Sequence, residues 1–188
     1  MREKKIAVLI SGNGSNLRAL VSAGIKVDCV ISNKSDALGL EYAKNKAIEA
    51  IFLSPKGKSR LEYTKELIAL LNKKSIDFVC LAGFMFILDK IIFNTFKDNI
   101  LNIHPSLLPK YGGVGMYGMH VHEAVFFSGD KVSGATVHIV TEKCDTGPII
   151  MQEEVDISDC DTAKKIASKV LKVEHIIYAA AVKKFIAN

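Results

Sequence analysis

A short segment, Asn102-Ile103-His104-Pro105, carries side chains that could perform acyl transfer. Residues two apart on a β-strand point to the same side, roughly 6.5–7 Å apart, so Asn102 and His104 would project together from the end of a strand. An amide can stabilise an oxyanion and an imidazole can move protons, and both suit a tetrahedral acyl-transfer intermediate. The competing interpretation is a histidine at a strand end that only bonds to the backbone.

Asp145, in the turn Asp145-Thr146-Gly147-Pro148, is a candidate partner for His104. A carboxylate close to an imidazole raises the pKa of the imidazole toward neutral pH. Aspartates in turns are often only structural, because they bond to the local backbone. A catalytic role for Asp145 therefore requires that the fold bring the two side chains together.

Two further features indicate an anionic substrate. The turn from Ser11 to Asn16 contains two glycines, which allow a sharp backbone turn with available N–H groups. A helix is expected directly after this turn, and its positive end would favour a phosphate, although a plain tight turn is the alternative. Glu174 falls near the centre of the apolar stripe of the C-terminal helix, where a carboxylate is either buried with a partner or lines a polar site.

Three other motifs are interpreted as structural. Gly57-Lys58-Ser59 is similar to the end of a P-loop, but Phe52 stands where the first glycine is required. His120 and His122 diverge by about 200° on a helix, which is a poor geometry for binding one metal ion. His138 lies in an apolar strand and is predicted to be a packed, hydrogen-bonded histidine.

The composition predicts one cytoplasmic globular domain. The chain has 188 residues, 49% hydrophobic and 24% charged, which suits a single core. The net charge is +5, but the lysines are scattered, a pattern that disfavours nucleic-acid binding. No central apolar run reaches the about 20 residues that span a membrane. The four cysteines form no CxxC pair and are interpreted as reduced thiols. We therefore expect neither a nucleic-acid nor a membrane partner.

The elements that must position these side chains alternate between apolar strands and helices. Strands are expected at residues 6–10, 27–31, 50–53, 78–82 and 100–104, and helices at 15–23, 36–46, 59–73 and 89–96, with Asp36 and either Ser15 or Asn16 as caps. Such alternation is typical of βαβ units with a parallel sheet. A Pro/Gly-rich loop then precedes a helix near 121–127, two strands at 135–141 and 149–155 that could pair antiparallel, and a helix at 161–185. The prediction is a single-domain α/β fold: a mostly parallel Rossmann-like sheet with helices on both faces and an antiparallel C-terminal strand pair.

Six segments, in this order, resemble the folate-dependent phosphoribosylglycinamide formyltransferases. They are Ile10-Ser-Gly-Asn-Gly-Ser-Asn16, Ile31-Ser-Asn-Lys34, Leu81-Ala-Gly-Phe-Met85, Leu101-Asn-Ile-His-Pro-Ser-Leu-Leu-Pro-Lys110, residues 134–140 leading to Asp145-Thr-Gly-Pro148, and Glu174-His175. The resemblance implies the formyltransferase fold over residues 1–188, with a phosphate-binding βαβ part over about 1–104 and a folate-side part over about 105–188.

The resemblance implies transfer of the formyl group of 10-formyltetrahydrofolate, the co-substrate, to the amine of 5-phosphoribosylglycinamide in de novo purine (IMP) synthesis, without a metal. It implies Asn102, His104 and Asp145 as the catalytic set. Asn102 and protonated His104 would stabilise the oxyanion, while Asp145 would keep His104 charged. The implied partners are the two small-molecule substrates, and the chain would be a monomer or a homodimer.

The resemblance also assigns binding residues. Those for the ribonucleotide are Gly14, Ser15, Asn16 and Glu174. Those for the folate, largely through backbone, are Arg60, Met85, Phe86, Ile87, Leu88, Asn102, Thr141, Glu142, Lys143, Cys144 and Asp145. Phe86 stands where many relatives have arginine, which would remove a charged contact to the folate. The glycine-rich loop 112–118 departs from the commonest form and is expected to be a mobile flap near His120.

Other formyl-folate enzymes are the alternatives. Methionyl-tRNA formyltransferase carries an additional RNA-binding domain, and formyltetrahydrofolate hydrolase carries an additional N-terminal regulatory domain; neither extension is expected to fit in 188 residues. A non-catalytic phosphate-binding module is a rival of a different class. Such a module would have no need of Asn102, His104 and Asp145 together.

Overall fold

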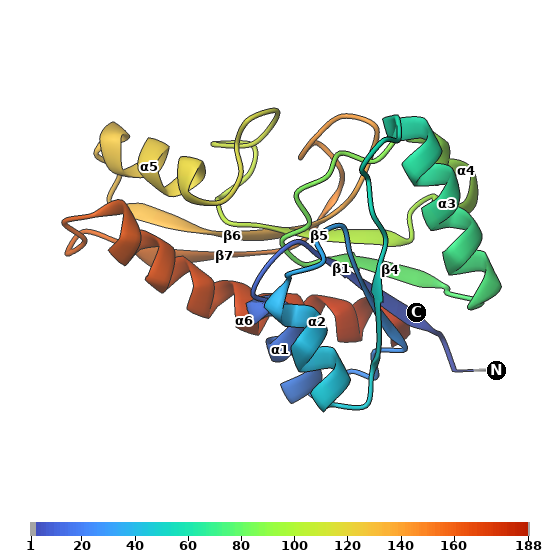
Figure 1. Ribbon diagram of the computed structural model, residues 1–188. Helices are drawn as coiled ribbons and strands as arrows, with labels where there is room; N and C mark the ends of the chain where they lie inside the picture. The colour runs from blue at the N-terminus through green and yellow to red at the C-terminus, as the bar shows by residue number, and fades with distance from the viewer. Residues whose placement is uncertain (1–2, 188) are drawn as a thin grey trace. The chain divides into compact units, whose positions relative to one another are not determined.

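The computed structural model describes residues 3–187, and Figure 1 labels their helices and strands. Within this range the strands form a sheet with the order β3-β2-β1-β4-β5-β6-β7. The pairs among β1 to β4 are parallel, whereas β6 and β7 are antiparallel. The predicted α/β fold, with its mostly parallel sheet and antiparallel C-terminal pair, is confirmed. The chain divides into two compact units, residues 1–101 and 102–188, each described by itself.

The first unit is a regular succession of strands and helices. It contains β1 (Ile6–Ile10), α1 (Ser15–Ser22), β2 (Cys29–Ser32), α2 (Leu38–Asn45), β3 (Glu49–Phe52), α3 (Arg60–Lys73), β4 (Phe78–Leu81), the 3₁₀ helix η1 (Lys90–Ile92) and α4 (Phe93–Phe96). β1 pairs with both β2 and β4, and all its residues are buried, as expected for a parallel strand covered on both faces. β3 lies at the edge of the sheet, and its residues are half-buried or exposed.

The starts of the helices in this unit differ from the predicted caps. Gly14 precedes α1 and Ala37 precedes α2, and neither start has a side-chain capping bond. Gly14 has a φ of 70°, and a Cβ at this position would lie 2.9 Å from the Cα of Gly39. Glycine therefore suits both the left-handed backbone and the close approach. α3 begins with a capping box, in which Ser59 and Glu62 satisfy each other's backbone N–H groups.

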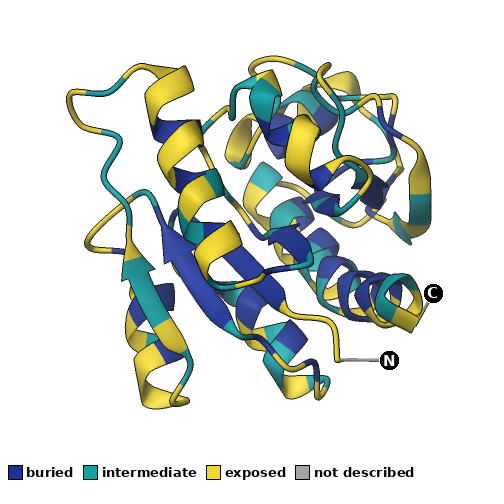
Figure 2. Ribbon diagram, turned by 90° about the vertical axis from the view of Figure 1, so that its right-hand side faces the viewer, coloured by how far each residue is buried: buried dark blue, intermediate teal, exposed yellow. Residues whose placement is uncertain are grey.

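The second unit has longer connections. It contains the end of β5 (Ile100–His104), α5 (Met119–Ser128), β6 (Val132–Ile139), β7 (Ile149–Asp156) and α6 (Ala163–Ala187). The predicted antiparallel strand pair is present, and its register shifts at a β-bulge between Val137 and His138. α6 packs against both strands. Figure 2 shows buried residues concentrated on the strands and on one side of the helices.

The turn between β6 and β7 requires a glycine. A Cβ on Gly147 would lie 1.7 Å from the carbonyl oxygen of Ile139, a distance at which no side chain fits. The backbone N–H of Ile139 also donates to the carbonyl oxygen of Pro148 (2.9 Å). The close approach of these two segments fixes the turn in which Asp145 lies.

Candidate active site

His104 is the last residue of β5 and is buried. Its Nε2 lies 2.9 Å from the carbonyl oxygen of Tyr111, and because a carbonyl can only accept, Nε2 carries the proton of this hydrogen bond. Nδ1 lies 3.6 Å from Oδ2 of Asp145. In the neutral imidazole, Nδ1 is therefore unprotonated, and its lone pair is on the side of the Asp145 carboxylate.

Asp145 is held from three directions. It has a left-handed backbone, with a φ of 56°. Its Oδ2 accepts a hydrogen bond from the backbone N–H of Gly113 (2.9 Å), and its Oδ1 lies 3.5 Å from Nε2 of His138. The fold thus brings together His104 and Asp145, which the sequence placed 41 positions apart.

His138 connects Asp145 to Asn102. Its Nδ1 lies 3.0 Å from the carbonyl oxygen of Ile139, so this nitrogen donates, and its Nε2 lies 3.1 Å from Nδ2 of Asn102. His138 is packed and hydrogen-bonded, as predicted, but the sequence did not indicate that its partners would be two of the proposed catalytic residues. A signal was present: Thr136 and His138 are polar residues two apart, on either side of apolar Val137, and both are buried.

Burial decides the protonation of His104. Burial lowers its pKa below the usual histidine range and outweighs the charge of Asp145 and the Tyr111 hydrogen bond, which raise it; His138 lowers it further. The prediction that Asp145 raises this pKa holds for that one interaction, but the predicted direction of the net shift is wrong. Free His104 is therefore neutral at pH 7.

The carboxylate of Asp145 is ionised. Burial by itself raises its pKa, but the interaction with His138, the attraction of His104 when that ring is protonated, and the hydrogen bond from the Gly113 N–H lower it by more, so the pKa lies below the usual range. The cluster thus combines an ionised carboxylate, a neutral imidazole and a carboxamide. Such a set can accept a proton at Nδ1 of His104 and hold the resulting imidazolium beside Asp145.

The comparisons with known proteins agree with this chemistry. Residues 4–182 match the formyl transferase family. The chain belongs to this family. The phosphoribosylglycinamide formyltransferase of Escherichia coli (strain K12) is 41% identical over 187 residues, which are 96% of this chain and 86% of the relative. The predicted resemblance is confirmed.

Two other relatives show how far the likeness extends. The chloroplastic phosphoribosylglycinamide formyltransferase of Vigna unguiculata is 42% identical over 97% of this chain, which spans only 61% of that relative's length. The crystal structure of glycinamide ribonucleotide transformylase 1 from Symbiobacterium toebii matches with a TM-score of 0.92 at 37% identity, over 98% of this chain and 88% of that chain.

The residues predicted to bind the ribonucleotide are found in both units. Gly14, Ser15 and Asn16 stand where β1 passes into α1; Gly14 and Asn16 are buried and Ser15 is half-buried. Glu174 lies in the middle of α6 and is only 8% exposed. Glu174 is thus buried, and whether it also lines a substrate site stays a prediction.

The predicted folate residues of the first unit lie at the start of α3 and in the segment after β4. Arg60 is the first residue of α3, and its Nε lies 3.8 Å from Oδ2 of Asp89. The segment Met85 to Leu88 is tied to the glycine-rich turn, because the Met85 N–H donates to Oγ of Ser11 (2.7 Å). The ring of Phe86 lies 4.4 Å from the ring of Tyr63, measured between centroids. Phe86, where the resemblance predicts a charged contact to be missing, is therefore packed on an aromatic ring.

The predicted folate residues of the second unit, 141–145, form a turn with internal bonds. The hydroxyls of Thr141 and Thr146 both donate to the carbonyl oxygen of Lys143, at 3.2 and 3.1 Å. Glu142 and Lys143 are exposed, and Cys144 is half-buried. The backbone of this turn is thereby fixed next to Asp145.

Residues 3–187 contain no group of three or more His, Cys, Asp or Glu side chains able to hold a metal ion. The two histidines whose spacing on a helix was judged poor for metal binding differ in exposure: His120 is exposed and His122 is buried. Burial, and the nearby His104, lower the pKa of His122 to about 4. No helix in the described range is long and apolar enough to cross a membrane.

Proposed function

We propose that this chain transfers the formyl group of 10-formyltetrahydrofolate to the amine of 5-phosphoribosylglycinamide. The products would be N-formylglycinamide ribonucleotide and tetrahydrofolate, in purine synthesis. The observation that carries the proposal is the cluster of buried His104 and His138 with half-buried Asn102 and Asp145, in a member of the formyl transferase family. Both substrates are anions, which suits the net charge of +5.

The ribonucleotide is proposed to bind through groups from each unit. In the first unit, Gly14, Ser15 and Asn16 offer backbone N–H groups at the N-terminus of α1, where the helix dipole favours a phosphate. In the second unit, the buried carboxylate of Glu174 is proposed to contact the same substrate.

The folate is proposed to bind mainly through backbone. Met85 to Leu88 and Thr141 to Cys144 are two segments held in place by hydrogen bonds, which suits recognition of a heterocycle by main-chain groups. The exposed guanidinium of Arg60 is proposed to meet the acidic tail of the folate.

The chemistry follows from the protonation of the cluster. The neutral amine attacks the formyl carbon, and the resulting oxyanion is stabilised by the Asn102 amide and the imidazole. Nδ1 of His104 takes a proton from the attacking nitrogen, directly or through water. The imidazolium then stays between Tyr111 O and the Asp145 carboxylate. It returns the proton to N10 of the folate as the C–N bond to the formyl group breaks, so His104 ends the cycle neutral.

This sequence of steps replaces the expectation that His104 begins protonated. Burial holds the free imidazole neutral, so its charge develops only as the amine loses its proton. Asp145 then stabilises the imidazolium at the stage when the oxyanion also exists.

Absorbance of the folate product tests the proposed function. Purified protein with 10-formyltetrahydrofolate and phosphoribosylglycinamide should yield tetrahydrofolate, and omission of the ribonucleotide should abolish it. Product without any acceptor amine would instead indicate a formyl-folate hydrolase. No product under either condition would reject the reaction.

We also propose a cytoplasmic enzyme with small-molecule partners only. The scattered lysines give no nucleic-acid patch, and the four cysteines are free. A monomer or homodimer is expected, and light scattering on the eluted protein distinguishes the two states.

A further inference from the structure

The acceptor of the His104 hydrogen bond is itself in an unfavourable backbone conformation. Tyr111, whose carbonyl oxygen lies 2.9 Å from Nε2 of His104, has a φ of 56°. This left-handed region is disfavoured for a bulky residue that is not glycine. Its occupation implies that other contacts hold Tyr111 in place.

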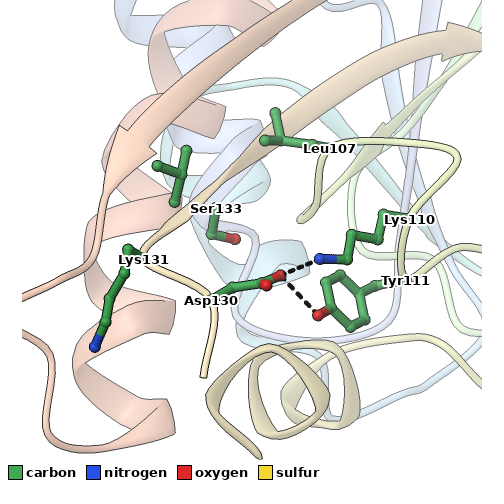
Figure 3. Close-up of a pocket in the computed structure, with 7 residues that line it drawn as sticks. Leu107, Lys110, Tyr111, Asp130, Lys131 and Ser133 are labelled. Carbon is green, nitrogen blue, oxygen red and sulfur yellow. Dashed lines mark hydrogen bonds and ion pairs between the residues drawn. The ribbon is translucent and has the colours of Figure 1, made fainter. Parts of the chain in front are cut away.

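The contacts that hold Tyr111 converge on Asp130. The Tyr111 hydroxyl lies 2.8 Å from Oδ2 of Asp130 and 2.6 Å from Oγ of Ser128. Nζ of Lys110 donates to the same Asp130 oxygen (2.5 Å). Figure 3 shows both side chains pointing at this carboxylate from one loop. These two bonds lower the pKa of Asp130, which keeps it ionised at neutral pH.

The carboxylate lies on the wall of a cavity of about 300 Å³, lined by Leu107, Lys110, Tyr111, Asp130, Lys131, Val132 and Ser133 (Figure 3). Asp130 itself is half-buried, whereas His104 is buried. A series of contacts therefore connects the partly solvated Asp130 carboxylate, through Tyr111, to Nε2 of His104.

The earlier part of the same loop has a separate and deeper anchor. Oγ1 of Thr136, fully buried, donates to the carbonyl oxygen of Ser106 (2.6 Å) and accepts from the Leu108 N–H (3.1 Å). Gln152 adds a bond to the Leu108 carbonyl oxygen (3.0 Å). Because these bonds do not involve Asp130, loss of Asp130 should release Tyr111 without unfolding the loop.

We propose that Asp130 is a positioning residue for His104, acting through the side chain and carbonyl of Tyr111. This inference rests on the proposed function in that it takes His104 as the acid–base group. Holding the carbonyl of Tyr111 fixes the proton of neutral His104 on Nε2. The lone pair of Nδ1 is thereby kept toward Asp145, where the reaction needs it.

The test uses Asp130→Ala and Tyr111→Phe, with Asp159→Ala as the matched control. Asp159 also forms an ion pair with a lysine, Lys169, on the surface of the same unit, but contacts no part of the cluster. We expect each test variant to lower kcat about tenfold with both KM values within about twofold, because the catalytic group is misplaced while binding is retained. The double variant should be no worse than the more impaired single variant, because both changes break one connection.

A second measurement follows the ring of His104 directly by NMR, with its signal assigned from a His104→Gln variant. Asp145, His138 and His122 are the titratable groups that act on this ring. They are unchanged in Asp130→Ala, whereas the Tyr111 hydrogen bond, which raises the His104 pKa, is weakened. The titration midpoint of His104 should therefore move to lower pH in Asp130→Ala and stay in place in Asp159→Ala.

An unmoved His104 midpoint in Asp130→Ala overturns the positioning role, whatever happens to the rate. An equal effect of Asp159→Ala overturns it as well. The titration needs no substrate. If the wild-type protein forms no product but Asp130→Ala still moves the midpoint, the proposed function fails while the contact between Asp130 and His104 stands.

Discussion

Residues 1–101 and 102–188 present their proposed functional groups in different ways. In the first unit the groups are mainly backbone at the ends of regular elements, such as the turn before α1 and the segment after β4. In the second unit the proposed catalytic groups are side chains, with His104 buried and both Asn102 and Asp145 half-buried. They lie in an irregular region, with a β-bulge beside His138 and left-handed backbone at Tyr111 and Asp145.

This difference separates binding from chemistry. A parallel βα unit places N–H groups and a helix dipole at a strand end without any special side chain, which suits recognition of a phosphate. Proton transfer instead needs named side chains at fixed distances, and the bulge, the turn glycine and the strained residues supply those distances. Changes in the second unit's cluster of Asn102, His104 and Asp145 should therefore lower kcat, whereas changes in the first unit should raise KM.

The largest effect is expected from His104→Ala in the second unit. Removal of the acid–base group should lower kcat by about 10³-fold, within the range typical of such groups, with little change in either KM. Steady-state kinetics with both substrates, and a thermal melt to confirm folding, measure this. A variant with near-normal kcat would show that the cluster is structural and would remove the distinction between the units.

Asp145→Asn should lower kcat by about 10²-fold and also change the pH profile. The proposed reaction needs neutral His104, so kcat/KM should fall as the pH drops through the His104 pKa, which burial places below the usual histidine range. Since the charge of Asp145 raises this pKa, the variant's acid limb should lie at lower pH than that of the wild type. If kcat/KM instead fell as the pH rose through the His104 pKa, the reaction would require free His104 to be protonated.

The sequence predicted the regular parts of the molecule better than the irregular ones. The apolar runs of β1 and β4 and the helix pattern of α3 were sufficient to predict a parallel α/β sheet, because parallel strands are buried along their whole length. The caps of α1 and α2 were wrong, because Gly14 and Ala37 begin these helices without the side-chain bonds on which cap rules depend.

The candidate site residues could be predicted where the type of side chain and its place in the sequence indicate a chemical role. Asn102, His104 and Asp145 were proposed in this way, and the structure brings their side chains close together. The contacts of His138 with Asn102 and Asp145 depend on the pairing of strands, which the sequence did not specify. The Tyr111 carbonyl and the Gly113 N–H are backbone groups, so residue type could not predict their contacts. The sign of the His104 shift also required the structure, because burial, not the Asp145 charge, dominates it.

In the first unit, Gly14→Ala should chiefly raise the KM for the ribonucleotide, by about tenfold if one well-aligned N–H contact to the phosphate is lost. A Cβ at this position meets the Cα of Gly39 at 2.9 Å, so the turn must shift. Gly24→Ala is the matched control, because Gly24 also has a positive φ, 80°, but open space around it. Each variant should lose about 1 kcal/mol of folding stability from the left-handed backbone, and Gly14→Ala should lose more because its Cβ meets Gly39. Only Gly14→Ala should change KM. Equal kinetics in the two variants would show that the turn does not bind the phosphate.

The smallest effect is expected at Phe86, a proposed folate position of the first unit with an uncharged side chain. Phe86→Arg should lower the KM for the folate about threefold by adding a charge attracted to its carboxylates, and added salt should weaken the gain. The variant also loses the ring contact with Tyr63, which costs about 1 kcal/mol in stability.

Phe86→Leu is the control for that variant, because it loses the same ring contact and gains no charge. Denaturant melts should show a similar loss for both variants, and only the arginine should lower the folate KM. If both variants raise the folate KM to the same extent, the aromatic packing of Phe86 on Tyr63 determines the conformation of the folate segment. The first unit would then also act through a packed side chain, and the contrast with the second unit would be one of degree.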